Sequence, residues 1–165
     1  MFYALLAKIL SHPTVFKYLL AYAKKTPYSH IMSPDGSETY MERYWVFNPY
    51  PGTGAKRRFE WFPLSIRIHR INVPDKDRHS HDHPWNARTF ILQGWYRENR
   101  NKPRNLNRYR GQGSTATLKF GEYHRITEVS DGGVYTLFVT GKYRGTWGFL
   151  VDGVKVTYKE YLSRR

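Results

Sequence analysis

The chain has 165 residues, a length typical of one domain, and its 27 lysines and arginines against 13 aspartates and glutamates give a formal net charge of +14. Aromatic residues make up 17% of the sequence, which excludes a wholly disordered chain. Because there is no cysteine, disulfides, zinc–thiolate sites, iron–sulfur clusters and cysteine nucleophiles are excluded, and any metal must be held by histidine or oxygen ligands. No apolar run reaches the ~18 residues of a transmembrane segment.

The first thirty residues predict a helical extension. Apolar residues recur there at helical spacing: Phe2, Leu5, Leu6, Ile9 and Leu10. Ser11 and Pro13 are typical of a cap and a first-turn proline, and they predict a second helix from Thr14 to about Lys24. A secretory signal is not indicated, since no uninterrupted apolar stretch precedes a small-residue cleavage site. A pair of basic amphipathic helices could also lie on a membrane surface. We favour packing on the domain or on a second subunit, which makes a homodimer reasonable.

Residues 31–165 predict a β-barrel domain. The turn signal Pro34-Asp35-Gly36 opens it, and short runs of β-branched and aromatic residues then alternate with Gly, Pro, Asn and Asp. The predicted strands are 40–47, 64–71, 89–93, 95–98, 116–120, 124–129, 134–140, 146–151 and 154–158, with loops at 49–58 and 99–113. Many short strands without long helices between them favour a mostly β sandwich or small barrel over a parallel α/β sheet.

The segment from Asp77 to Trp85 carries three histidines, His79, His81 and His83, each two residues apart. On an extended strand, residues two apart point to the same side, so two neighbouring imidazoles can bind one divalent ion. Imidazole suits Fe, Zn, Cu and Ni. The alternative is a solvated polar loop.

A single strand cannot supply a whole metal site, so a further ligand must come from elsewhere. His124 is the best candidate because it follows the glycine turn at Gly121 and opens an apolar strand. His69 is the competitor, but it alternates with isoleucines and could equally be a core or surface histidine. For His12 and His30 we prefer a structural role, since neither has a partner nearby in sequence.

This spacing resembles the first motif of the cupin superfamily, which reads Gly, five residues, His-x-His, three or four residues, Glu, six residues, Gly. His81, His83 and Gly94 match it, whereas Ala87 stands at the glutamate position and Asp75 at the leading glycine.

The second cupin motif reads Gly, five residues, Pro-x-Gly, two residues, His, three residues, Asn. Gly113, Gly121 and His124 match it, while Lys119 replaces the proline and Glu128 the asparagine. The resemblance covers about residues 64–158. It implies a double-stranded β-helix, or jelly-roll barrel.

The run from His81 to Trp85, His-Asp-His-Pro-Trp, is also similar to a run in small cupin-like proteins of phage and bacterial genomes. That likeness implies no particular activity. It implies a cytoplasmic location, in the host cytoplasm if the protein is phage-encoded.

With Ala87 in place of the glutamate ligand, the motif resembles that of the three-histidine thiol dioxygenases. The resemblance implies that His81, His83 and His124 hold a divalent metal ion, with Fe(II) favoured and Zn, Ni, Mn or Cu as alternatives. A three-histidine site leaves the ion its full double charge, so it should attract an anionic, chelating substrate beside O₂. We therefore expect a non-haem Fe(II) dioxygenase-like enzyme acting on a small anionic substrate.

Two further residues are candidates for catalysis. Glu128 lies four residues after His124 on the same predicted strand and should share its face. It could bind the metal, orient His124, act as a general base, or form a surface salt bridge. His79 is in phase with the histidine pair but precedes the motif, so it could be a ligand or a proton shuttle.

Other residues could bind substrate or shape the pocket. Arg67 and Arg70 point to opposite faces of one predicted strand, so only one can point inward and bind a carboxylate or phosphate. Tyr123 and Trp85 flank the ligands and could shape the pocket, Tyr123 as a further catalytic candidate. Asp82 should point away from the metal and orient a neighbouring loop.

A cationic cluster with one acid, Glu98, spans residues 97–110: Arg97, Arg100, Lys102, Arg104, Arg108 and Arg110. Tyr96 and Tyr109 interleave with it, as a stacking platform for single-stranded nucleic acid would require. Lys56-Arg57-Arg58 forms a second cluster, but no nucleic-acid motif is present. Two alternatives to the enzyme therefore stay open: a non-catalytic cupin module for a nucleotide or other phosphorylated ligand, and a phage nucleic-acid-associated protein.

Overall fold

The computed structural model describes residues 1–33, 36–52, 54–100 and 106–164. In chain order its elements are α1 (Phe2–Leu10), α2 (Pro13–Ala23), β1 (Pro27–Met32), β2 (Thr39–Phe47), β3 (Ser65–Ile71), β4 (Ala87–Gln93), β5 (Trp95–Arg100), β6 (Leu106–Gly111), β7 (Thr115–Leu118), β8 (His124–Val129), β9 (Val134–Thr140), β10 (Gly148–Val151), β11 (Val154–Thr157) and α3 (Tyr158–Ser163). Pro34 and Asp35 of the predicted turn, and Lys102 and Arg104 of the basic cluster, lie outside the described residues.

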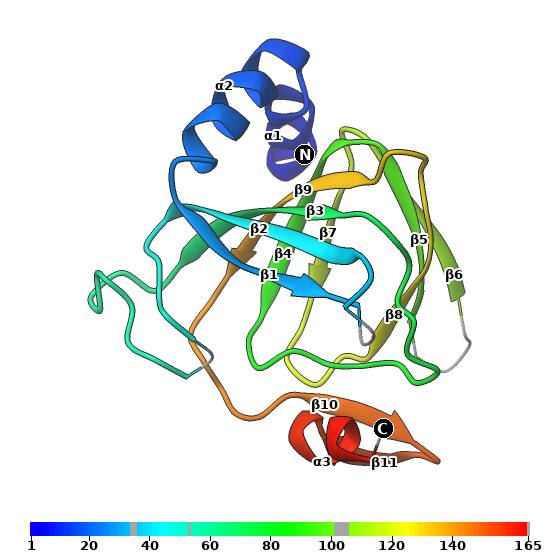
Figure 1. Cartoon of the computed structure of the whole chain (residues 1–165). Coiled ribbons are helices and arrows are strands. Elements are labelled where there is room, and N and C mark those ends of the chain that lie inside the picture. The colour runs from blue at the N-terminus through cyan, green and yellow to red at the C-terminus, as the bar shows by residue number, and fades with distance from the viewer. Residues whose placement is uncertain (34–35, 53, 101–105, 165) are drawn as a thin grey trace.

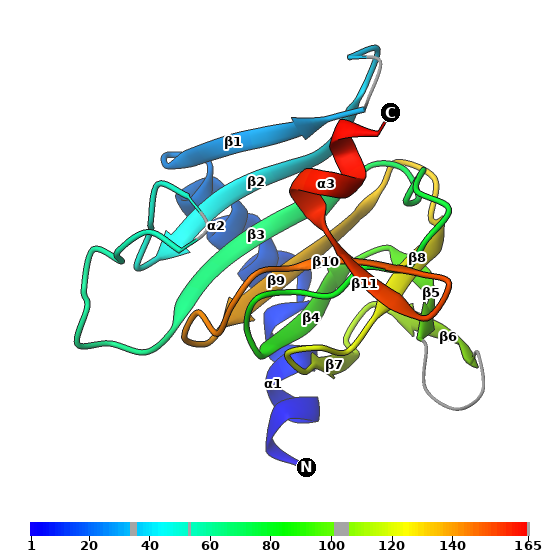
Figure 2. The ribbon, with the colours of Figure 1, turned by 90° about the horizontal axis from the view of Figure 1, so that it is seen from below.

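Two antiparallel sheets form the barrel (Figures 1 and 2). The larger sheet has the order β1-β2-β3-β9-β4-β7. The other side consists of β6-β5-β8 and the hairpin β10-β11. His81 joins these two parts, because it bridges to His124 of β8 and to Phe149 of β10. Neighbours that are far apart in sequence, such as β3 and β9, are typical of a jelly roll. The predicted mostly β, jelly-roll architecture is confirmed.

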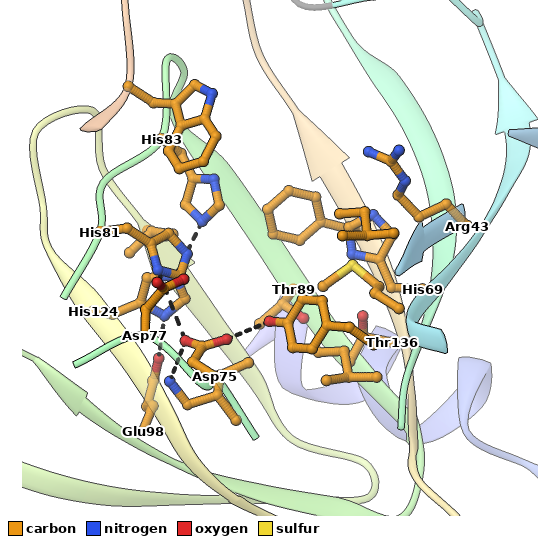
Figure 3. Close-up of a pocket in the computed structure, with 18 of the residues that line it drawn as sticks. Arg43, His69, Asp75, Asp77, His81, His83, Thr89, Glu98, His124 and Thr136 are labelled. Atoms are coloured by element: carbon orange, nitrogen blue, oxygen red, sulfur yellow. Dashed lines mark hydrogen bonds and ion pairs between the residues drawn. The ribbon is translucent and has the colours of Figure 1, made fainter. Parts of the chain in front are cut away.

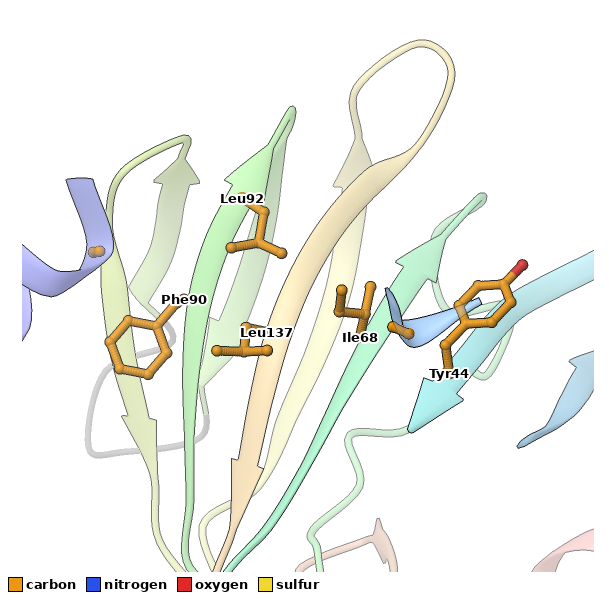
Figure 4. Close-up of a cluster of buried hydrophobic side chains, with 7 residues drawn as sticks. Tyr44, Ile68, Phe90, Leu92 and Leu137 are labelled. Atoms are coloured by element: carbon orange, nitrogen blue, oxygen red, sulfur yellow. The ribbon is translucent and has the colours of Figure 1, made fainter. Parts of the chain in front are cut away.

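The helices α1 and α2 cover the outer face of the larger sheet (Figure 1). The buried core between them is formed by Tyr44, Ile68, Phe90, Leu92 and Leu137 of the sheet with Ala7 and Ala23 of the helices (Figure 4). Strand residues alternate between two faces, so this face is apolar while the other face of β3 carries Arg67 and His69 into the barrel. Packing of the helix pair on the domain is therefore confirmed.

The side of the helix pair away from the sheet keeps apolar side chains exposed, among them Phe2, Leu5, Ile9, Tyr18 and Tyr22. The homodimer expected from such faces stays a prediction. Within the described residues, no helix has both the length and the apolarity that a membrane crossing requires.

Several element boundaries differ from the sequence-based expectation. β1 and β6 were not predicted, and β6 lies inside the segment expected to be a loop. Tyr158 begins α3 instead of ending a strand. Ser11 does not cap α2: its Oγ donates to the carbonyl of Lys8 at the end of α1, and His12 precedes Pro13 at the start of α2.

Candidate metal centre

Three histidines converge inside the barrel (Figure 3). The Nε2 atoms of His83 and His124 lie 3.0 Å apart, although 41 residues separate them in the chain. His81 completes the group, whose candidate ligand atoms all lie within 4.8 Å of one another. The backbones of His81 and His124 exchange two hydrogen bonds of 2.9 Å, which sets their rings side by side. The structure thus brings together the three residues that the sequence predicts as ligands.

The charge state of this group suits a metal ion. Burial lowers the pKa of His81 to about 4, and Asp75 offsets part of that effect. Burial, followed by the neighbouring histidines, holds the pKa of His83 well below its ordinary value. Neutral imidazoles offer lone pairs to Fe, Zn, Cu or Ni. Two nitrogens 3.0 Å apart also suit neighbouring bonds of about 2.1 Å to one ion. The residues present therefore fit a divalent metal.

A buried carboxylate holds His124 from behind. Oε2 of Glu98 lies 3.2 Å from Nδ1 of His124. Oε1 of Glu98 accepts hydrogen bonds from Arg100 at 3.0 Å and Arg110 at 2.8 Å. Burial alone would raise the pKa of Glu98, but His124 and the two arginines lower it to about 2. Glu98 is thus an anion that accepts a hydrogen bond from Nδ1–H of His124, and the Nε2 lone pair of His124 faces the other two histidines.

Sequence reasoning missed this role of Glu98. The residue stood out only as the one acid in a basic run, and its contact with His124 depends on the pairing of β5 with β8. Its isolation among arginines was nevertheless a usable signal, because a lone carboxylate amid cations is readily held as an anion.

Two aspartates fix the segment that carries His81 and His83. Asp75 accepts from the backbone N–H of Ile126 at 2.8 Å and from the hydroxyl of Tyr40, and its Oδ2 lies 3.8 Å from Nδ1 of His81. Asp82 is fully buried and accepts from the N–H of Gly148 at 2.7 Å. It is not among the described residues that line the cavity with the histidines, which agrees with the expectation that it points away from them.

The histidines open into a cavity of about 590 Å³ between the two sheets. His69 and Arg43 lie across it from the histidine cluster (Figure 3). Arg67 also lines it, with Trp85 and Phe138. His69 is therefore a buried cavity residue and not a member of the histidine cluster. Burial, followed by Arg67 and Arg43, holds the pKa of His69 well below its ordinary value.

The two candidate arginines have opposite orientations. Arg67 points into the cavity and is 5% exposed. Arg70 points to the outer face, where it pairs with Glu42 at 3.1 Å and donates to the carbonyl of Gly132 at 3.1 Å. The strand alternation thus selects Arg67, and Arg70 is not placed to bind a ligand in the cavity.

The expectation that Glu128 shares the face of His124 is wrong. The register pairs Arg97 with Glu128 but Glu98 with Ile126, so Thr127 is an extra residue in β8. Such a β-bulge shifts the alternation by one position. Glu128 is consequently exposed and forms an ion pair of 3.1 Å with Arg97, which is the surface salt bridge left open above.

His79 and Tyr123 lie outside the group of ligand atoms. Nδ1 of His79 is 2.9 Å from the hydroxyl of Tyr161 in α3, so this histidine holds the C-terminal helix. Neither His79 nor Tyr123 is among the described residues that line the cavity, whereas Trp85 is. The ring of Trp85 lies 5.1 Å from that of His83.

The basic run 97–110 is less open than its sequence suggests. Arg100 and Arg110 turn toward Glu98, and Tyr96 is buried. Tyr109 packs on Trp95 with ring centroids 5.6 Å apart. The two tyrosines therefore do not form a shared stacking platform for nucleic acid.

Comparison with known proteins links the chain to cupins by structure. No protein-family model matches the sequence. A search of curated proteins likewise gives no match. A solved cupin-2 domain from Rhodospirillum rubrum superposes with a TM-score of 0.52 at 11% identity, covering 82% of this chain and 78% of that one.

Two enzyme structures are similar over part of their length. Oxalate decarboxylase of Bacillus subtilis, which has Mn(II) centres, gives a TM-score of 0.52 at 11% identity, and the match covers 86% of this chain but 33% of that one. Fe(II)-HppE, solved with the alternative substrate (S)-1-HPP, gives 0.51 at 12% identity, with 73% and 57% covered. The chain thus spans about a third of the length of oxalate decarboxylase and just over half of that of HppE. At such identities the likeness concerns the fold, and the chain has the fold of the cupin superfamily.

Proposed function

We propose that the protein is a metal-dependent, dioxygenase-like enzyme that oxidises a small anionic molecule at His81, His83 and His124. The observation that carries this proposal is the meeting of three imidazoles, one buried and two partly buried, in the same cavity as Arg67, a buried cation without a carboxylate partner among the described residues. A cationic side chain beside a metal site suits a substrate that carries negative charge.

The side chains have separable roles in this scheme. His81, His83 and His124 hold the ion through neutral nitrogens, and Glu98 fixes the tautomer and orientation of His124. Arg67 binds and orients the anionic group. When bound, Fe(II), which we favour over Zn, Ni, Mn or Cu, would supply the redox chemistry with O₂ that the side chains lack. The metals named for the two enzymes of similar fold, Fe(II) and Mn(II), support a redox-active divalent ion at this site.

The site assignment is tested by metal analysis of untagged protein purified without nickel resin. Wild-type protein should carry close to one metal ion per chain, and the triple variant His81→Ala, His83→Ala, His124→Ala should carry almost none. His79→Ala is the matched control, because His79 belongs to the same segment but binds Tyr161. Unchanged metal content in the triple variant would refute the assignment.

Catalysis is tested separately by oxygen consumption of Fe(II)-loaded protein with candidate thiols and carboxylates. Oxygen consumption by the wild-type protein that the triple variant lacks would support the proposed enzymatic activity.

We also propose that the protein acts in the cytoplasm.

A second candidate is a non-catalytic module that binds a nucleotide or other phosphorylated ligand. It is favoured by a second cation, Arg43, which lines the same cavity as Arg67. Salt-sensitive nucleotide binding by titration calorimetry, without turnover in the oxygen assay, would support this candidate over the first.

A further inference from the structure

Arg67 is a buried cation whose hydrogen-bonding capacity is largely unused. One nitrogen, Nη1, donates to the hydroxyl of Tyr50 at 3.1 Å. The Nε atom is buried and has no partner, and among the described residues no carboxylate forms an ion pair with this guanidinium. An unpaired buried charge is costly, so a site of this kind is completed by an anion from outside the chain.

Aromatic rings enclose the same guanidinium. Its Cζ atom lies 5.3 Å from the ring centroid of Trp85, 5.4 Å from that of Trp45 and 5.5 Å from that of Phe138. Cation–π contacts of this kind stabilise the charge in part. They leave Nη2, for which the described residues supply no hydrogen bond, to donate to a carboxylate in the cavity.

The anion site and the histidine cluster share one space. Trp85 and Phe138 flank Arg67, and they also lie 5.1 Å and 6.0 Å from the ring of His83. A molecule bound at Arg67 therefore lies next to the three candidate metal-ligand histidines.

The cavity is far larger than a two- or three-carbon acid requires. At about 590 Å³ it has room for about twenty water molecules of ~30 Å³ each, within the range of pockets that hold drug-sized ligands. Beyond the cluster its walls are mostly apolar: Met41, Ile71, Leu118, Ile126 and Phe149. Such walls favour an apolar ligand body over water.

From these contacts we infer that the substrate is an amphipathic carboxylate, with its anionic head at Arg67 and an aromatic or similarly bulky apolar body filling the cavity. This inference rests on the proposed function for the reaction. The binding site that it describes consists of residues other than the metal ligands.

The test is titration calorimetry of chelator-treated protein with three matched probes. They are 4-phenylbutyrate, butyrate (the same head without the ring) and 4-phenylbutan-1-ol (the same body without the charge). 4-Phenylbutyrate should bind about tenfold or more tightly than either partner compound, because it alone satisfies both the cation and the apolar walls. Equal affinities, or no binding of 4-phenylbutyrate, would overturn the inference.

Variants of two arginines on one strand then locate the head group. Arg67→Met should weaken 4-phenylbutyrate binding about tenfold or more, whereas Arg70→Met, on the opposite face of β3, should leave it unchanged. Arg67→Lys is the second variant, for use if Arg67→Met does not fold. It retains the charge but not the two-pronged fork, so it should bind 4-phenylbutyrate with intermediate affinity. Equal binding by folded Arg67→Met and wild-type protein would refute the assignment. Failure of the metal-site proposal is a separate result, because it is measured as metal content of the histidine variants.

Discussion

Oε2 of Glu98 lies 3.2 Å from Nδ1 of His124, and the same carboxylate is the shared acceptor of two arginines. This contact joins the candidate metal centre to the most completely buried ion-pair group that the described residues contain. A carboxylate that holds the remote nitrogen of a ligand histidine orients the ring and raises its basicity.

Glu98→Gln should therefore weaken metal binding by about 10- to 100-fold, the usual effect of losing such a partner. It should also lower the free energy of unfolding by about 3 kcal/mol or more, since Arg100 and Arg110 lose their shared counter-charge. Metal titration and denaturant unfolding measure the two effects. Glu128→Gln is the control: its exposed pair with Arg97 should contribute less than about 1 kcal/mol. Equal metal affinity of the Glu98→Gln variant and wild-type protein would contradict this role.

His69 predicts a pH dependence of stability in chelator-treated protein. Its folded-state pKa is depressed, so as pH falls below about 6.5 the unfolded chain takes up a proton that the folded chain resists. Stability should thus be lost on acidification, with His69 contributing at most about 1.4 kcal/mol per pH unit. Unfolding of His69→Gln between pH 7 and 5 should show a shallower slope than wild-type protein. His12→Gln, at an exposed position, should keep the wild-type slope.

Asp82 predicts a local change in the C-terminal hairpin. Its carboxylate accepts from the backbone of Gly148 at 2.7 Å and from Nζ of Lys155 at 2.6 Å, so it ties both strands of β10–β11 to the histidine segment. In Asp82→Asn, amide hydrogen exchange in residues 148–157 should accelerate, while exchange in β9 should not change. Lys155→Met removes one of the two contacts and should give a smaller effect. An unchanged exchange rate in both variants would show that the hairpin is held by other contacts.

Gly94 and Gly121, one from each cupin-like motif, predict unequal costs of substitution. Both have left-handed backbone, with φ of +76° and +75°. A Cβ at Gly94 would lie 2.5 Å from Oγ of Ser130 and 2.8 Å from the carbonyl of Gly133, whereas a Cβ at Gly121 would meet open space. Gly121→Ala should cost about 1 kcal/mol from backbone strain alone. Gly94→Ala should cost clearly more in denaturant unfolding. Equal costs would mean that the Ser130 turn moves aside freely.

The fold was predictable wherever burial imposes a period of two. The predicted strand 134–140 coincides with β9, whose side chains alternate between the helix-covered core and the cavity. β1 escaped prediction because it begins with a proline and is mostly exposed, so it lacks that alternation. β6 lies in a run of charged and polar residues, so no apolar alternation marks it, although its partner is the preceding strand β5.

The site was predictable in its ligands but not in its supports. The sequence alone identified His81, His83 and His124, because the spacing of the two motifs can be recognised without knowledge of the fold. Glu128 was misplaced because a bulge at Thr127, which no local pattern announces, reverses the side on which it lies. The contact of Glu98 with His124 depends on strand pairing, and the inward orientation of Arg67 depends on which face of β3 the helices cover.

The two-sided bridging of His81 has a thermodynamic consequence. The residue lies between β8 and β10, so the segment that carries two of the candidate ligands, His81 and His83, also joins these two strands. Docking of the C-terminal hairpin and loading of the ion are therefore linked equilibria, and whatever favours one favours the other. Trp147 and Tyr158, which flank the hairpin in sequence, stack with parallel rings 4.7 Å apart, and Trp147 also lies 6.1 Å from the ring of His81. Proteolytic removal of the chain after Thr140 would leave all three histidines in place but would remove the contact of His81 with Phe149, so the ion should bind more weakly.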